Sequence, residues 1–171
     1  MSQTLPTLHM LCGKIASGKS TLADHLTRED KAVRIAEDQW LNTLFLGEIE
    51  TGADYLRCTG RLRETVAPHV IDLLNAGVSV VLDFAANTIQ QRVWMRGILD
   101  RTSADHQLHV LDVPEEVCLA RLRARNASGE HPFSATEEQF HQFSKHFVLP
   151  TPQEGLIIVF HTTPEKAQPT K

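Results

Sequence analysis

A glycine-rich stretch near the start of the chain has the residue types and spacing of a phosphate-binding loop. Residues 13–20 read Gly-Lys-Ile-Ala-Ser-Gly-Lys-Ser and match the pattern G-x-x-x-x-G-K-[ST] at every fixed position. Because Gly13 and Gly18 carry no side chain, backbone N–H groups of the loop can approach phosphate oxygens closely. In such a loop the Lys19 ammonium bridges the β- and γ-phosphates, and the Ser20 hydroxyl binds Mg²⁺. The sequence therefore predicts a site for a nucleoside triphosphate and magnesium.

The segments on either side of the loop fit this prediction. The apolar run Leu8–Cys12 is typical of a buried strand, and Thr21–Leu26 favours a helix. The free N–H groups at the start of that helix would face the phosphates. We expect the nucleotide to contact the following residues: Gly13, Ala16, Ser17, Gly18, Lys19, Ser20 and Thr21. The alternative is a glycine-containing turn that matches the pattern by chance.

Two aspartates associated with apolar runs could act on the phosphates. Asp38 comes soon after the run Val33–Ala36, where a carboxylate near a γ-phosphate could accept the proton of an attacking hydroxyl. It could also be the N-cap of a helix over Gln39–Leu46, and its role as base or metal ligand stays open. Asp83 ends the run Val78–Asp83 and is predicted to bind magnesium. A turn-forming aspartate is the alternative for this position.

A helix predicted to begin at Pro114 carries two arginines on one edge. Arg121 and Arg125 are four residues apart, so they are neighbours on the helix surface. Their guanidinium groups could close over a triphosphate and neutralise the charge that develops during phosphoryl transfer. The alternative is a solvated basic face that pairs with Glu115 or Glu116.

Further residues are expected around the open side of the site. Residues 115–135 form a predicted short helical lid over the phosphates. Asn87 and Arg92, which follow the Asp83 run, could touch the substrate. We expect residues 162–171, with two prolines, to form a frayed tail without function.

The order of apolar runs indicates what positions these residues. Short strand-like runs alternate with helical stretches, and they lie at Leu8–Cys12, Val33–Ala36, Val78–Asp83, Leu108–Leu111 and Leu156–Phe160. This alternation is typical of an α/β fold with a mostly parallel sheet covered by helices on both faces, a three-layer sandwich. Ligands of such folds bind at the carboxyl ends of the strands. The longest predicted helix covers Tyr55–Ala76, with Pro68 as a kink or as its true start.

Composition limits the other classes of protein. A chain of 171 residues fits one domain, here 1–171, and a net charge of −4 argues against a general nucleic-acid binder. The three cysteines form no C-x-x-C pair, and the nine histidines form no tight metal-binding pattern. Without a signal-like or membrane-spanning stretch, we expect a cytoplasmic protein and no membrane partner.

Taken together, these motifs resemble the small P-loop kinases. The resemblance rests on the loop 13–20, Asp38, Asp83, and the run Leu111-Asp112-Val113-Pro114 that leads to the two arginines. The chain resembles in particular the polynucleotide 5′-hydroxyl kinase domain and the zeta-toxin and chloramphenicol phosphotransferase group. The resemblance implies an adenylate-kinase-like core with a five-stranded sheet and with ATP as the phosphate donor.

The resemblance also implies roles for single residues. Lys19 would act on the phosphates, Ser20 on Mg²⁺, and Asp38 as the base that activates the acceptor. Arg121 and Arg125 would be the lid arginines. The catalytic set is thus Lys19, Asp38, Arg121 and Arg125, and the metal set is Ser20 and Asp83.

Two functions follow as hypotheses. The first is transfer of the γ-phosphate of ATP to a hydroxyl of a small molecule, nucleoside or nucleotide. The acidic segment Phe45–Arg61 favours a small neutral or cationic alcohol over a nucleic acid. The second is a nucleotide-responsive ATPase switch, which would not need Asp38 as a base. The sequence names neither the acceptor nor the oligomeric state.

Overall fold

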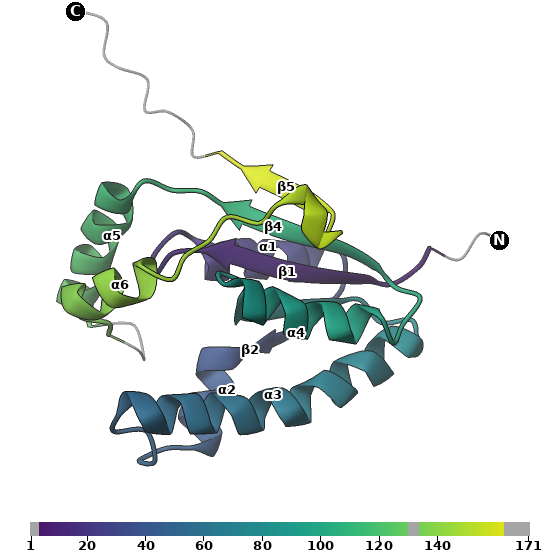
Figure 1. Ribbon diagram of the computed structural model, residues 1–171, viewed down its shortest axis with the longest axis horizontal. Coiled ribbons are helices and arrows are strands. Elements are labelled where there is room, and N and C mark those ends of the chain that lie inside the picture. The colour runs from purple at the N-terminus through teal and green to yellow at the C-terminus, as the bar shows by residue number, and fades with distance from the viewer. Residues whose placement is uncertain (1–3, 130–133, 163–171) are drawn as a thin grey trace, which may run out of the picture.

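A parallel sheet forms the centre of the computed structural model, which describes residues 4–129 and 134–162. Each strand is short, and the bounds are β1 Thr7–Gly13, β2 Val33–Ala36, β3 Val80–Ala85, β4 Asp105–Leu111 and β5 Ile158–His161. The strand order is β2-β3-β1-β4-β5, and every neighbouring pair is parallel. The α/β fold with a five-stranded sheet predicted from the sequence is therefore confirmed (Figure 1).

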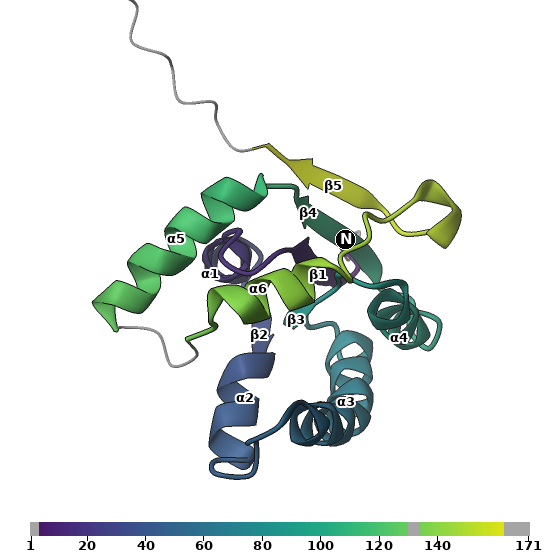
Figure 2. The same cartoon turned by 60° about the vertical axis from the view of Figure 1, so that its left-hand side comes forward.

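Helices connect the strands and cover both faces of the sheet (Figures 1 and 2). They are α1 Lys19–Glu29, α2 Glu37–Leu44, α3 Gly52–Asn75, α4 Ile89–Leu99, α5 Glu115–Ser128 and α6 Glu137–Ser144, and a short 3-10 helix covers Pro152–Glu154. Helix α1 packs on one face, and α3 and α4 pack on the other. The result is the predicted three-layer sandwich.

The alternation of side chains along β1 shows why both faces need helices. Leu8, Met10 and Cys12 belong to the core that α3 and α4 complete, whereas Leu11 belongs to the core under α1. Successive residues of a strand point to opposite faces, so an apolar strand buries both of its faces only between two layers. Cys12 is fully buried, as its predicted core position requires.

Several boundaries differ from the sequence-based expectation. Helix α3 begins three residues earlier than predicted because Thr51 and Asp54 form a capping box at its start. Pro68 lies inside this helix and does not mark its beginning. Strand β3 runs to Ala85, so Asp83 lies within the strand and not at its end.

Helices α5 and α6 lie beyond the carboxyl ends of the strands, where the predicted lid would have to be (Figure 1). Buried residues of both helices, among them Leu122 and Phe140, form a small core with Leu111. Ile15 and Ala16 of the glycine-rich loop pack against this core. Part of the predicted lid, residues 130–133, lies outside the described residues, as do residues 163–171 of the predicted tail.

Three histidines cross the sheet in a line of ring-to-ring hydrogen bonds. His9 Nδ1 lies 3.0 Å from His109 Nε2, and His109 Nδ1 lies 2.9 Å from His161 Nε2. At the other end, His9 Nε2 lies 2.6 Å from a carboxylate oxygen of Asp30. In the described part of the chain no group of three or more His, Cys, Asp and Glu side chains could hold a metal ion. These histidines therefore join strands β1, β4 and β5.

Candidate active site

The glycine-rich loop joins β1 to α1 and has the strained geometry that its glycines allow. Gly18 has a φ of 104°, a value that residues with a side chain rarely adopt. A Cβ atom on Gly13 would clash with the Ser17 hydroxyl and would lie 3.3 Å from Leu111. Ser17 Oγ is buried and has no hydrogen-bond partner within the described residues, so it can accept a ligand contact.

Lys19 lies at the start of α1 with its ammonium folded back over the loop. Its Nζ donates to the carbonyl oxygens of Gly13 at 2.5 Å and of Lys14 at 2.8 Å. Burial lowers the pKa of Lys19, and the nearby carboxylates of Asp83 and Asp38 oppose this shift. The predicted phosphate-binding cation is thus close to both predicted acidic residues.

One pocket unites residues from three separate parts of the sequence. Ser20, Asp38 and Asp83 line it together with neighbouring polar groups and one alanine, namely Arg34, Ala36, Gln39, Asn42 and Thr43. The pocket has a volume of about 270 Å³ and opens to solvent. The structure therefore brings the predicted metal-binding hydroxyl and both predicted carboxylates to one place.

Asp38 lies in the first turn of α2 and is exposed. The N-cap of this helix is Ala36, so the alternative role of Asp38 as N-cap is wrong. Its neighbour Glu37 is 5% exposed and pairs with Arg63 of α3 at 3.2 Å. This ion pair links α2 to α3 and so positions the first turn of α2, which carries Asp38.

Burial raises the pKa of Glu37 to about 7, although Arg63 opposes the shift. The sequence reasoning missed this residue. Its charged side chain directly follows the β2 run, and that position was the only available signal.

Asp83 is held by an arginine of the neighbouring strand. Arg34 donates to Asp83 Oδ2 from Nε at 3.2 Å and from Nη2 at 2.5 Å, and it also contacts Asp24. A carboxylate and the Ser20 hydroxyl are hard oxygen donors that suit Mg²⁺. Mg²⁺ bound here would take its remaining ligands from water and phosphate, which is its usual behaviour in nucleotide sites.

The two predicted lid arginines lie on α5 near the loop and Asp38. Arg121 is exposed, and its Nη1 donates to Ser17 O at 3.3 Å. Arg125 is half-buried, and its Nε has no hydrogen-bond partner in the described part of the protein. Burial lowers the pKa of Arg125, and the charge of Asp38 opposes the shift. Arg121 therefore lies beside the predicted phosphate loop, and Arg125 lies close enough to Asp38 to feel its charge.

The alternative for Arg121 and Arg125 was an ion pair with Glu115 or Glu116. The ion pairs found at this helix among the described residues have other partners. Glu115 lies 3.8 Å from Lys14 Nζ. Arg123, on the opposite edge of α5, forms the ion pair with α6, with its Nε 2.6 Å from Glu137 Oε1. The edge of α5 that faces the loop is thus distinct from the edge that binds α6.

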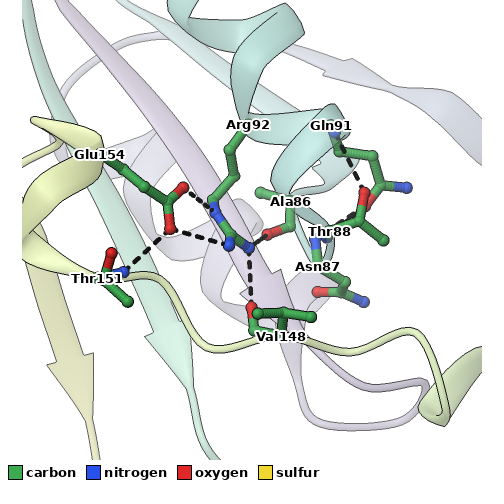
Figure 3. A network of polar contacts seen from close by, with 8 residues as sticks. All are labelled: Ala86, Asn87, Thr88, Gln91, Arg92, Val148, Thr151 and Glu154. Atoms are coloured by element: carbon green, nitrogen blue, oxygen red, sulfur yellow. Dashed lines mark hydrogen bonds and ion pairs between the residues drawn. The ribbon is translucent and has the colours of Figure 1, made fainter.

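Asn87 and Arg92, which could have touched a substrate, serve the scaffold in this structure. Arg92 is 1% exposed, and its guanidinium contacts Glu154, Ala86 O and Val148 O (Figure 3). The expectation that Arg92 touches substrate is therefore wrong, because its donors face the protein interior. The Asn87 amide forms two hydrogen bonds with Gly13.

Comparison with known proteins agrees with this geometry. A family model described as "AAA domain", AAA_33, matches residues 8–150. No curated protein matches the chain.

No helix within residues 4–129 and 134–162 combines the length and the apolar character that crossing a bilayer requires.

Solved structures with similar folds include several kinases. A candidate kinase from Chloroflexus aurantiacus aligns with a TM-score of 0.74 at 20% identity, over 96% of this chain and 93% of that one. The Pnkp1/Rnl/Hen1 RNA repair complex aligns with a TM-score of 0.64 at 24% identity, over 85% of this chain and 45% of that one. The Mycobacterium tuberculosis APS kinase CysC, in complex with AMPPNP and APS, gives 0.56 at 18% identity, over 83% and 97%.

These identities are low, so the solved structures support the fold and no particular substrate. The family model, in contrast, covers most of the chain and includes the loop, Asp38, Asp83, Arg121 and Arg125. The chain therefore belongs to the AAA_33 family and has a nucleotide-binding fold of the P-loop kinase type.

Proposed function

We propose that this protein is a phosphotransferase that moves the γ-phosphate of ATP to a hydroxyl of a small molecule, nucleoside or nucleotide. The observation that carries the proposal is the shared pocket of Ser20, Asp38 and Asp83 beside the loop. A site that only binds a nucleotide needs no exposed carboxylate in this position. A carboxylate there suits an enzyme that must remove a proton from an attacking hydroxyl.

Each residue has a distinct part in the proposed reaction. Asp38 accepts the proton as the acceptor oxygen forms its bond to the γ-phosphorus. The bond between that phosphorus and the β–γ bridging oxygen breaks, and ADP leaves. Lys19 and Arg125 offset the negative charge on the phosphate oxygens. Arg121 covers the phosphates on the side of the glycine-rich loop. Mg²⁺, held by Ser20 and Asp83, would supply further charge neutralisation when bound.

The acidic segment Phe45–Arg61 does not define the class of acceptor. It favours a neutral or cationic alcohol by charge, but two of its three carboxylates, those of Glu48 and Asp54, have structural partners. Arg57 lies 3.0 Å from Asp54 and 3.8 Å from Glu48. Asp54 also caps α3 through Thr51, and these hydrogen bonds lower its pKa to about 2. Support for the acceptor hydroxyl therefore comes from Asp38 and not from this segment.

The test is phosphate transfer from ATP labelled at its γ-phosphate, with magnesium and a library of sugars, polyols, amino alcohols, nucleosides and nucleotides. We expect at least one compound to become labelled. For that compound, Asp38→Asn should lower kcat by about a hundredfold or more, because general base catalysis contributes at least that much. ADP affinity should change by less than about twofold, because Asp38 acts on the acceptor.

The matched control is Asp72→Asn, the same chemical change at an exposed position of α3. Its transfer rate should equal that of the unchanged protein. If no compound accepts phosphate although ATP binds, the kinase proposal fails. A protein partner captured only in the presence of ATP would then favour the nucleotide-responsive switch.

A further inference from the structure

Asn87 connects the phosphate loop to a distant part of the chain. Its side chain forms two hydrogen bonds with the first loop residue: Gly13 N–H donates to Oδ1 at 2.8 Å, and Nδ2 donates to Gly13 O at 2.9 Å. Its main chain is held as well, since Gln91 Oε1 accepts from its N–H at 2.9 Å. The N–H of Val148, which follows α6, donates to Asn87 O at 2.8 Å.

Arg92 connects the residues around Asn87 through its hydrogen bonds (Figure 3). Arg92 Nη1 donates to Ala86 O at 3.0 Å and to Val148 O at 2.9 Å. Its Nε and Nη2 bind both carboxylate oxygens of Glu154, at 2.6 and 3.0 Å. The buried Arg92 guanidinium thus fixes two groups. One is the Ala86 carbonyl, in the peptide before Asn87, and the other is Val148, whose N–H binds the Asn87 carbonyl. An amide mounted in this way can hold its target with little loss of freedom.

The bonds of Lys19 show what such an anchor does for the loop. An ammonium has three donor protons, and Lys19 directs bonds to Gly13 O and Lys14 O. Contact with both a β- and a γ-phosphate oxygen takes two protons, so at least one loop carbonyl must lose its bond to Lys19. Lys14 O keeps a bond from Ser17 N–H at 3.1 Å, and Gly13 O keeps the bond from Asn87.

We propose that Asn87 is a positioning residue for nucleotide binding, whose amide holds the Gly13 peptide so that Lys19 can turn to the phosphates. Gly13 is buried, and a buried carbonyl without a donor is costly. Without the amide, Lys19 would be retained on Gly13 O in competition with the phosphates. This inference rests on the proposed nucleotide site, but it does not depend on an acceptor.

The chemistry of an amide explains why asparagine suits this position. Its oxygen accepts from Gly13 N–H while its nitrogen donates to Gly13 O. An aspartate would keep the acceptor, but it would place a second oxygen against the carbonyl and add negative charge near the phosphates. An alanine would leave both groups of the Gly13 peptide without the side-chain partner.

The experiment measures, by calorimetry with Mg²⁺ and the full chain, the dissociation constant of a non-hydrolysable ATP analogue, which carries both the β- and the γ-phosphate that Lys19 must reach. Asn87→Ala should weaken binding of this analogue by about tenfold, the usual scale for one lost hydrogen bond to a buried group. Asn87→Asp should weaken it further, although this variant is nearly isosteric. An affinity of Asn87→Ala for the analogue within about twofold of the unchanged protein would overturn the proposal.

Gln91→Ala is the matched control for local loss of stability. It removes the acceptor of the Asn87 and Thr88 N–H groups but leaves the Asn87 amide in place. We expect its affinity for the ATP analogue to stay within about twofold of the unchanged protein, because the Gly13 contacts remain. If Gln91→Ala weakens binding of the analogue as much as Asn87→Ala, the effect is a general loss of local structure and the proposal is wrong.

A second arm separates positioning from a purely structural role. In a Lys19→Met background no ammonium needs to be released, so Asn87→Ala should weaken binding of the ATP analogue by no more than about threefold at millimolar ligand. An undiminished factor of ten would contradict the proposed link to Lys19. Because nucleotide binding is the readout, a protein that behaves as expected here but phosphorylates no acceptor would refute only the kinase proposal.

Discussion

Arginines on α4 and α5 differ in what their donors contact, although both helices follow strands of the same sheet. Arg92 of α4 is 1% exposed and binds one carboxylate and two backbone carbonyls. On α5, Arg121 makes one long contact of 3.3 Å to the loop, and Arg125 has a buried Nε that binds no described group. All three residues are arginines, but Arg121 and Arg125 have more hydrogen-bond donors available for a ligand than Arg92 has.

This difference indicates which arginines of this fold can bind a substrate. A guanidinium that is already bound on several sides stabilises the scaffold, since a ligand would have to break those bonds first. A guanidinium near the loop with few protein contacts can bind phosphate without that cost. Three predictions test this contrast, and they begin with the largest expected effect.

Arg125→Ala should lower kcat for phosphate transfer by about a thousandfold, the lower range for an arginine that stabilises the transferring phosphoryl group. The melting temperature should change little, because the buried Nε of Arg125 has no hydrogen-bond partner among the described residues. Arg123→Ala is the control on the opposite edge of α5, and it should leave transfer unchanged. Equal transfer rates in the two variants would remove Arg125 from the mechanism.

Arg92→Met should show the reverse behaviour, with a loss of about 3 to 4 kcal/mol in the free energy of unfolding in urea. The physical reason is that Glu154 and two carbonyls lose their cation. Arg123→Ala removes the exposed pair with Glu137 and should cost no more than about 1 kcal/mol. A loss for Arg92→Met no larger than this would break the comparison.

The histidine line extends the contrast to groups that change charge. Both ring nitrogens of His109 are hydrogen-bonded, and protonation would turn both into donors and break one bond. Burial, the largest cause, lowers the pKa of His109 to about 4. The unfolded chain therefore binds the proton more readily, and stability should fall as pH falls from about 6.5 to about 4.

The expected size of this loss is about 2 to 3 kcal/mol, at roughly 1.4 kcal/mol for each unit of pKa. It is measured as the difference in urea unfolding between the unchanged protein and His109→Leu at several pH values. Glu37, whose raised pKa of about 7 acts in the opposite direction, is present in both proteins and cancels. Parallel pH profiles for the two proteins would show that His109 does not contribute.

Local sequence was enough to locate the loop, Asp38 and the five strands. Each of these depends on a short segment: the glycine spacing of 13–20, an apolar run, or a polar residue next to such a run. The mostly parallel sheet could be predicted because the strand-like runs alternate with helical stretches. Asp83 was found for the same reason, although its strand runs two residues further than predicted.

Contacts between distant segments could not be predicted in this way. Arg92 meets Glu154 across 62 positions of sequence, and Asn87 meets Gly13 across 74. The histidine line depends on how β1, β4 and β5 lie side by side. A single sequence shows residue types but not which of them meet, so it predicts Arg92 as a ligand contact and does not identify Asn87 as a partner of the loop.

The Arg92–Glu154 pair also has a consequence for synthesis on the ribosome. Strands β1, β2 and β3 and helix α4 emerge before the residues that neutralise Arg92. A nascent chain that ends before Glu154 would have to bury an unpaired guanidinium in order to pack α4 on the sheet. Docking of α4 should therefore wait until the last part of the fold has been made, and truncated products should stay open to proteolysis.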